Sequence, residues 1–100
     1  MTEHPVAVAP DTQEDFLRVG GGSSPQAVAS AIAHALPDAR SQVKVRAVGA
    51  GAVNQAVKAL AIARGYTAPR GLDLSFKVGF TNIDSRDGQI SAIVFTVMAA

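Results

Sequence analysis

The residues at positions 49–54, Gly-Ala-Gly-Ala-Val-Asn, have the types and spacing of a turn that could hold an anion. The alternating segment before them predicts a strand, and the segment after them predicts a helix. A strand that turns through glycines into a helix points backbone N–H groups at one place, where an exposed phosphate charge gains roughly 0.3–1 kcal/mol. Gly49 and Gly51 would allow close approach, and Asn54 and Lys58 share one helix face because they are four residues apart.

This turn does not match a dinucleotide-binding fingerprint. Asn54 stands where the G-x-G-x-x-G pattern needs its third glycine, and Asp73 lies near the start of its predicted strand rather than at a strand end. The chain also lacks a P-loop pattern, so we expect no cofactor. Two other interpretations stay open: that the glycines only permit a tight turn while Asn54 fastens a neighbouring loop, and that the turn senses a small anionic metabolite.

The remaining reactive residue types are scattered. Cysteine is absent, which excludes disulfides and thiolate metal sites. His4 and His34 are isolated, and the serines show no nucleophile elbow of the G-x-S-x-G type. The four acidic residues of positions 16–100 form no obvious pair. We therefore expect a protein that is not an enzyme, with neither catalytic residues nor a metal site.

The charge is distributed unevenly along the chain. Residues 1–15 hold four acidic and no basic residues, whereas residues 16–100 hold nine basic and four acidic residues, a formal charge of +5. A basic body is typical of proteins that bind polyanions. We expect residues 1–15 to be a flexible acidic tail that competes for the basic surface, so that its deletion tightens polyanion binding at low salt. No stretch resembles a signal peptide or a membrane span.

The periodicity of residues 16–100 predicts one α/β domain of the α+β two-layer type. Its element order is β-α-β-α-β-β, with two helices on one face of a four-stranded mixed sheet. We expect the first helix to begin after Ser24 and the second helix to end near Arg64, with Gly65 as its C-cap. The second face of the sheet should be partly basic. The expected elements are strands at 16–19, 42–48, 72–81 and 90–98, and helices at 25–36 and 50–64.

The second predicted helix is apolar on nearly every side, and a domain of this size cannot bury such a helix completely. We therefore expect a homo-oligomer, a dimer or higher, whose interface includes Val53, Val57, Leu60 and Ala61. The four phenylalanines fall at core-facing or two-sided strand positions, which argues against a base-stacking platform. Any nucleic-acid binding should then depend mainly on backbone charge.

Residues 47–59, Ala-Val-Gly-Ala-Gly-Ala-Val-Asn-Gln-Ala-Val-Lys-Ala, closely resemble the stage V sporulation protein S family. The likeness continues through Ala-Ile-Ala-Arg-Gly at 61–65 and Ala-Pro at 68–69, and covers about residues 16–98. The resemblance implies a small bacterial regulator linked to spore development, with a fold like that of Alba, a dimeric DNA- and RNA-binding domain. Alba-like proteins hold the nucleic-acid backbone with basic residues near the first loop and the central strand, and with the last hairpin.

By position, this resemblance implies a nucleic-acid-binding set at Arg18, Gly21, Gly22, Ser23, Ser24, Lys44, Arg46, Gly49, Gly51, Asn54, Lys58 and Arg86. The chain departs from Alba in two places. Its first loop carries Gly-Gly-Gly-Ser-Ser where Alba-type loops commonly carry lysine, and its hairpin turn places Asp84 and Asp87 around Arg86. Both departures predict weaker duplex binding or a different ligand.

The sequence therefore predicts a non-enzymatic, regulatory nucleic-acid-binding protein of low sequence specificity. It would be cytoplasmic and not membrane-bound, with association with the nucleoid as one version of that location. The alternative is an oligomeric protein-interaction module in developmental regulation that binds no nucleic acid. Substitution of Lys44 and Arg46 by alanine distinguishes them, because only the first would lose its ligand.

Overall fold

The computed structural model describes the chain at residues 7–11 and 14–100, and its side chains from residue 16 onward. From the second strand onward the elements follow the order strand, helix, strand, helix, strand, strand, which confirms the predicted α+β arrangement. The elements are β1 (Ala7–Asp11), β2 (Glu14–Val19), α1 (Pro25–His34), β3 (Gln42–Ala47), α2 (Ala50–Thr67), the 3-10 helix η1 (Ala68–Arg70), β4 (Leu74–Ser85) and β5 (Gly88–Ala99).

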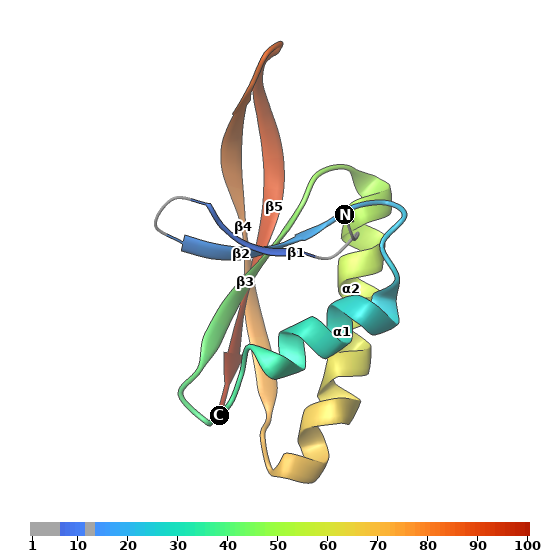
Figure 1. Cartoon of the computed structure of the whole chain (residues 1–100), viewed down its shortest axis with the longest axis vertical. Helices are drawn as coiled ribbons and strands as arrows, with labels where there is room; N and C mark the ends of the chain where they lie inside the picture. Colours follow the sequence, from blue (N-terminus) through green and yellow to red (C-terminus); the bar gives the residue numbers. More distant parts are fainter. Residues whose placement is uncertain (1–6, 12–13) are drawn as a thin grey trace.

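The described strands form one mixed sheet in the order β1-β2-β3-β5-β4. Strands β2 and β3 are parallel and are connected through α1, whereas the other neighbouring pairs are antiparallel. Both helices pack on the same side of the sheet (Figure 1). The opposite side, called the open face below, has none of the described helices on it (Figure 1).

The core lies between the helices and the inward positions of the central strands. Alternation places Leu17, Val45 and Val97 on the inward face, where each is fully buried. Pro25 at the first helical position and the Ser24 hydroxyl, which accepts from the Ala27 N–H at 3.3 Å, begin α1 as predicted. This packing fixes the strand register, because a one-residue slip would expose the apolar set.

The second helix is longer than the sequence analysis predicts. Gly65 lies inside α2, which continues to Thr67, so Gly65 is not the C-cap. The chain turns instead at Gly71, which directly follows η1 and has a φ of +78°. The buried Thr67 hydroxyl donates to the Ala63 carbonyl at 3.1 Å, which satisfies this polar group inside the last turn. Among the described residues, no helix, α2 included, is both long and apolar enough to cross a membrane.

The expected acidic tail at residues 1–15 differs from what the structure describes of it. Residues 7–11 form strand β1, which pairs antiparallel with β2 from Ala7↔Arg18 to Asp11↔Glu14, and β2 itself begins at Glu14. Residues 1–6 and 12–13 lie outside the described residues. Two prolines and the acidic composition hid this strand from the sequence analysis, because its hydrogen bonds come from pairing with β2 rather than from its own pattern.

Strands β4 and β5 extend past the rest of the sheet as a two-stranded arm. Strand β3 pairs with β5 only from Gln42↔Met98 to Ala47↔Ile93, whereas β4 pairs with β5 as far as Ser85↔Gly88. The arm is the long projection in Figure 1, and it makes the molecule elongated, with extents of 44 by 24 by 23 Å. The turn at its tip is formed by Arg86 and Asp87, as predicted for residues 84–88.

Candidate nucleic-acid interface

A row of side chains crosses the open face at one level of four neighbouring strands. Phe16 of β2 pairs with Lys44 of β3, Lys44 pairs with Thr96 of β5, and Thr96 pairs with Lys77 of β4. Register partners in a sheet project from the same face, and these residues alternate with the buried core positions. The register therefore places two lysines, one hydroxyl and one aromatic ring side by side.

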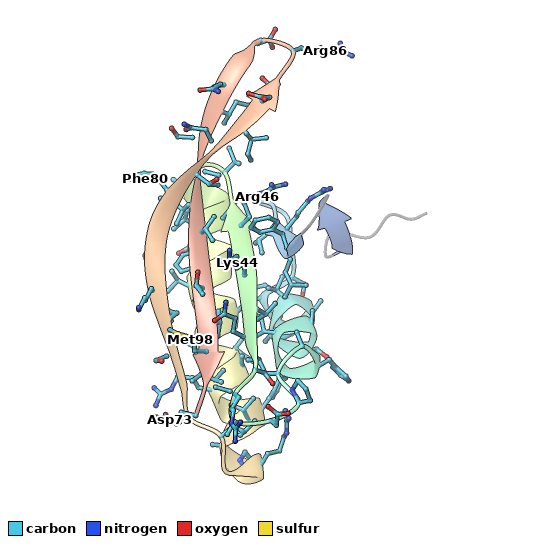
Figure 2. All side chains as sticks on the ribbon, turned by 90° about the vertical axis from the view of Figure 1, so that its left-hand side faces the viewer. Lys44, Arg46, Asp73, Phe80, Arg86 and Met98 are labelled. Atoms are coloured by element: carbon cyan, nitrogen blue, oxygen red, sulfur yellow. The ribbon has the colours of Figure 1, made fainter. Side chains whose placement is uncertain are left out.

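A second row lies one pleat further along the same face. Arg18 pairs with Arg46, Arg46 with Val94, and Val94 with Gly79. The Arg46 guanidinium carbon lies 5.0 Å from the centroid of the Phe16 ring, so a cation–π contact joins the two rows. Figure 2 shows Lys44 and Arg46 along β3, with the yellow helix α2 behind the sheet. Each row thus contributes two cations to the open face.

The acids with described side chains lie away from these two rows. Asp38 is in the loop between α1 and β3, where it accepts from the Arg40 N–H at 3.0 Å. Asp73 lies 4.0 Å from Arg64 at the opposite end of the molecule from the hairpin tip (Figure 2). Asp84 and Asp87 are at the end of the hairpin arm. Among the residues with described side chains, the charged ones in the middle of the open face are therefore all cations, which favours an anionic partner.

A groove of about 380 Å³ runs over this surface and contains the whole first row. Gly79 contributes to the groove because it has no side chain between Lys77 and Thr81 on the same face of β4. The lining residues are Phe16, Lys44, Lys77, Val78, Gly79, Phe80, Thr81, Val94 and Thr96.

The glycine-rich loop after β2 forms a second cluster against the beginning of α2. The Ser23 side chain is buried, and its hydroxyl accepts from the Gly20 N–H at 2.9 Å. The Gln55 side-chain amide donates to the Ser23 carbonyl at 2.8 Å, which fastens the loop to α2. Gly21 and Gly22 are exposed, and the Gly21 Cα lies 3.6 Å from the place that a Cβ on Gly51 would take. Of the expected loop residues, Ser23 and Ser24 therefore organise the loop and the start of α1, while the two glycines face outward.

The N-terminus of α2 is exposed beside this loop. Gly49 precedes the helix with φ of +91°, a conformation that glycine adopts at little cost, and no side chain caps the helix. The first turn of α2 contains no acid. Asn54 and Lys58 are exposed on the helix, and the Asn54 amide donates to Gln55 Oε1 at 3.2 Å. The loop is thus held by Gln55 rather than by Asn54, which the sequence analysis had considered for that task.

The candidate residues predicted from sequence are therefore at three places. The open face contains Arg18, Lys44 and Arg46, and the hairpin tip carries Arg86 far along the arm (Figure 2). The third place is the glycine-rich loop with the adjoining first half of α2, which together hold Gly21, Gly22, Ser23, Ser24, Gly49, Gly51, Asn54 and Lys58. The sequence analysis missed Lys77 and Gln55 as members. Lys77 could have been found from its position in the alternating run, but Gln55 could not, since its partner is 32 residues away.

A different surface is apolar. Exposed large side chains lie on α2 at Val57 and Tyr66, and on β4 at Phe76, Val78 and Phe80, of which Phe80 is 82% exposed. Val53 is half-buried and Ala61 is exposed, whereas Leu60 is 4% exposed and belongs to the core. Leu60 is thus not available for the predicted oligomer interface, because it faces the sheet of its own chain.

The phenylalanines are distributed differently from the sequence expectation. Phe95 is buried and packs edge-to-face with Phe76 at a centroid distance of 5.6 Å. Phe16 lines the groove on the open face, and Phe80 is largely exposed on the edge strand. The expected core-facing or two-sided placement is therefore wrong for Phe16, which lies on the open face, whereas Phe80 has the parity of the core but is largely exposed.

The described residues contain no group of three or more histidine, cysteine or carboxylate side chains arranged to hold a metal. A family model described as stage V sporulation protein S, SpoVS, matches residues 15–100. The chain belongs to that family, and the match begins at the second residue of β2 and covers all the later elements.

Proposed function

We propose that this member of the stage V sporulation protein S family is a regulatory protein, without catalytic activity, that binds the backbone of DNA or RNA with little sequence specificity. The observation that carries the proposal is the open face, where Arg18, Lys44, Arg46 and Lys77 lie in two adjacent rows away from the acids with described side chains. The family description supports a role in sporulation. The protein would act in the cytoplasm and, if DNA is the ligand, at the nucleoid.

Binding would depend on phosphate contacts to the cations of the open face. Lysine and arginine on a flat sheet replace the counterions of a phosphate backbone, and this gives affinity without reading bases. The glycine-rich loop and the N-terminus of α2 provide a second contact, where the exposed helix end favours an anion and Lys58 follows about two turns later. The hairpin arm would extend along the nucleic acid, with the charge of Arg86 offset by its acidic neighbours.

The second part of the proposal is a homo-oligomer. Val53, Val57 and Ala61 of α2 would pack against a second copy, together with the exposed apolar side chains of β4. Exposed apolar surface concentrated on one helix and an edge strand is typical of an interface. The same surface supports the alternative function, a protein-interaction module that binds no nucleic acid.

The test is fluorescence anisotropy with a labelled random duplex and a labelled single strand. The Lys44→Ala/Arg46→Ala variant is compared with Arg64→Ala, which removes an exposed cation near Asp73 instead. We expect the double variant to lose binding to both nucleic acids by at least tenfold while Arg64→Ala stays within about twofold, because only the former removes phosphate contacts. Equal binding by the double variant and the wild type, with both folded, would favour the protein-interaction module.

A further inference from the structure

The groove on the open face combines groups that backbone binding alone does not require. An aromatic ring and an aliphatic side chain, Phe16 and Val94, lie within the same groove as Lys44 and Lys77. Gly79 lies opposite Val94 on the same face, and the groove stays open there because glycine has no side chain. The volume of about 380 Å³ is within the range of small-ligand sites, roughly 300–1,000 Å³.

We propose that this groove binds one unpaired nucleotide of a single-stranded nucleic acid, with the base against Phe16 and the flanking phosphates at Lys44 and Lys77. This inference rests on the proposed function and specifies its ligand. A base has a flat apolar face and its phosphate is anionic, which matches a groove with a ring at one end and a lysine on each of two strands.

The Phe16 ring is held in place before a ligand arrives. The Arg46 guanidinium carbon lies 5.0 Å from the ring centroid, and Phe16 is half-buried. Phe16 lines the groove, whereas Arg46 is not among the lining residues. A ring that is already oriented loses little freedom when a base stacks on it, and this favours affinity.

A single-stranded nucleic acid fits the groove and the cations around it better than a duplex or a free nucleotide does. The bases of a duplex are stacked inside it and do not reach a depression in a sheet, whereas unpaired bases can turn outward onto an aromatic side chain. The cations of the second row, Arg18 and Arg46, lie next to the groove and would meet the phosphates of neighbouring nucleotides. A free nucleotide would not extend as far as that second row.

The experiment measures the binding of a labelled 12-nucleotide mixed-sequence single strand and of a labelled duplex to five forms of the full chain: the unmodified chain, Lys44→Ala and the three variants below. Phe16→Leu removes the ring but keeps an apolar side chain. Gly79→Leu fills the groove without changing charge, and its new Cβ meets no atom within 4 Å. Ser75→Leu is the matched control, since it adds the same side chain to the same face of β4 outside the groove.

We expect Phe16→Leu and Gly79→Leu each to weaken single-strand binding by about tenfold, while duplex binding stays within about twofold. Ser75→Leu should leave both affinities unchanged. Unchanged single-strand binding by Gly79→Leu would overturn the groove assignment. The proposed function would still stand if Lys44→Ala weakened the binding of both the single strand and the duplex. If millimolar nucleoside monophosphate displaced the single strand at constant ionic strength, the proposal that the ligand is a single-stranded nucleic acid rather than a free nucleotide would be overturned. Absence of binding by the unmodified chain would overturn both proposals.

Discussion

The number of cations on the open face predicts how duplex binding depends on salt. If Arg18, Lys44, Arg46 and Lys77 each neutralise one phosphate, the slope of log K against log salt is about −0.9 per contact, or roughly −3.6 in total. Raising the salt from about 50 to about 200 mM then weakens binding by about 150-fold. Lys77→Ala removes one contact, so its slope becomes roughly −2.7 and the same change of salt costs about 40-fold. Fluorescence anisotropy over four or five salt concentrations measures both slopes.

The control for this salt series is Arg64→Ala, because Arg64 is an exposed cation that lies 4.0 Å from Asp73, outside the proposed surface. Its slope should equal that of the unmodified chain. If Lys77→Ala retained the full slope, or if Arg64→Ala lowered the slope equally, binding would depend on total charge rather than on the two rows. The register argument for the interface would then be wrong.

Three further predictions concern the acidic segment, the loop and the helix end. Changing the four acidic residues of positions 1–15 to their amides should tighten duplex binding at low salt and have little effect at about 0.5 M salt, and weaker binding at low salt would contradict the competition. Gln55→Ala should lower stability by about 1 kcal/mol and the melting temperature by about 4–8 °C, because the Ser23 carbonyl loses its donor; an unchanged melting temperature would show that the contact is not stabilising. In urea unfolding, Gly65→Ala should stabilise by about 0.5–1 kcal/mol inside the helix, and Gly71→Ala should destabilise by about 1–2 kcal/mol at positive φ. Opposite signs would place the helix end at Gly65.

The order of the elements from β2 onward was predictable because each has a strong local signal. Ser24 followed by Pro25 marks the start of α1, and the alternation in β4 is strict. The end of α2 was not predictable in this way, since Gly65 has the usual residue type of a cap and the continuation depends on tertiary packing. Thr67 is fully buried there, and in the following η1 Arg70 donates to the carbonyl of Leu36, two residues after α1, at 2.7 Å, so tertiary packing fixes this end of the helix.

The candidate site was predictable only in part. Alternation in β3 and β4 placed Lys44, Arg46 and Lys77 on the second face of the sheet, but the sequence could not show that Lys77 lies at the same level as Lys44. That neighbourhood requires β5 to lie between β3 and β4, with Thr96 as the common partner. The position of Phe16 was likewise undetermined, because a short strand next to a glycine loop does not reveal which of its faces the helices cover.

The edge strand β4 connects the two proposed surfaces, because alternation sends its side chains to opposite faces. Lys77 and Gly79 belong to the open face, whereas Phe76, Val78 and Phe80 share the parity of the core and are exposed, as is Val57 of α2. A dimer formed through the apolar surface would leave both open faces uncovered. One long duplex could then contact both faces, and the second contact would be intramolecular.

A variant that dissociates the dimer tests this connection without touching the cations. Val57→Gln replaces a 48% exposed side chain, so folding should be little affected, and analytical ultracentrifugation should show a monomer. Ala27→Gln, on an exposed position of α1, is the control and should keep the oligomer. Binding to a duplex long enough for two faces should weaken by about 100-fold in Val57→Gln, whereas binding to a duplex long enough for one face should not change. An equal loss of affinity for the long and the short duplex would mean that α2 itself contacts the nucleic acid. If the unmodified chain were already a monomer, one duplex could not be held by two linked faces, and this argument would be wrong.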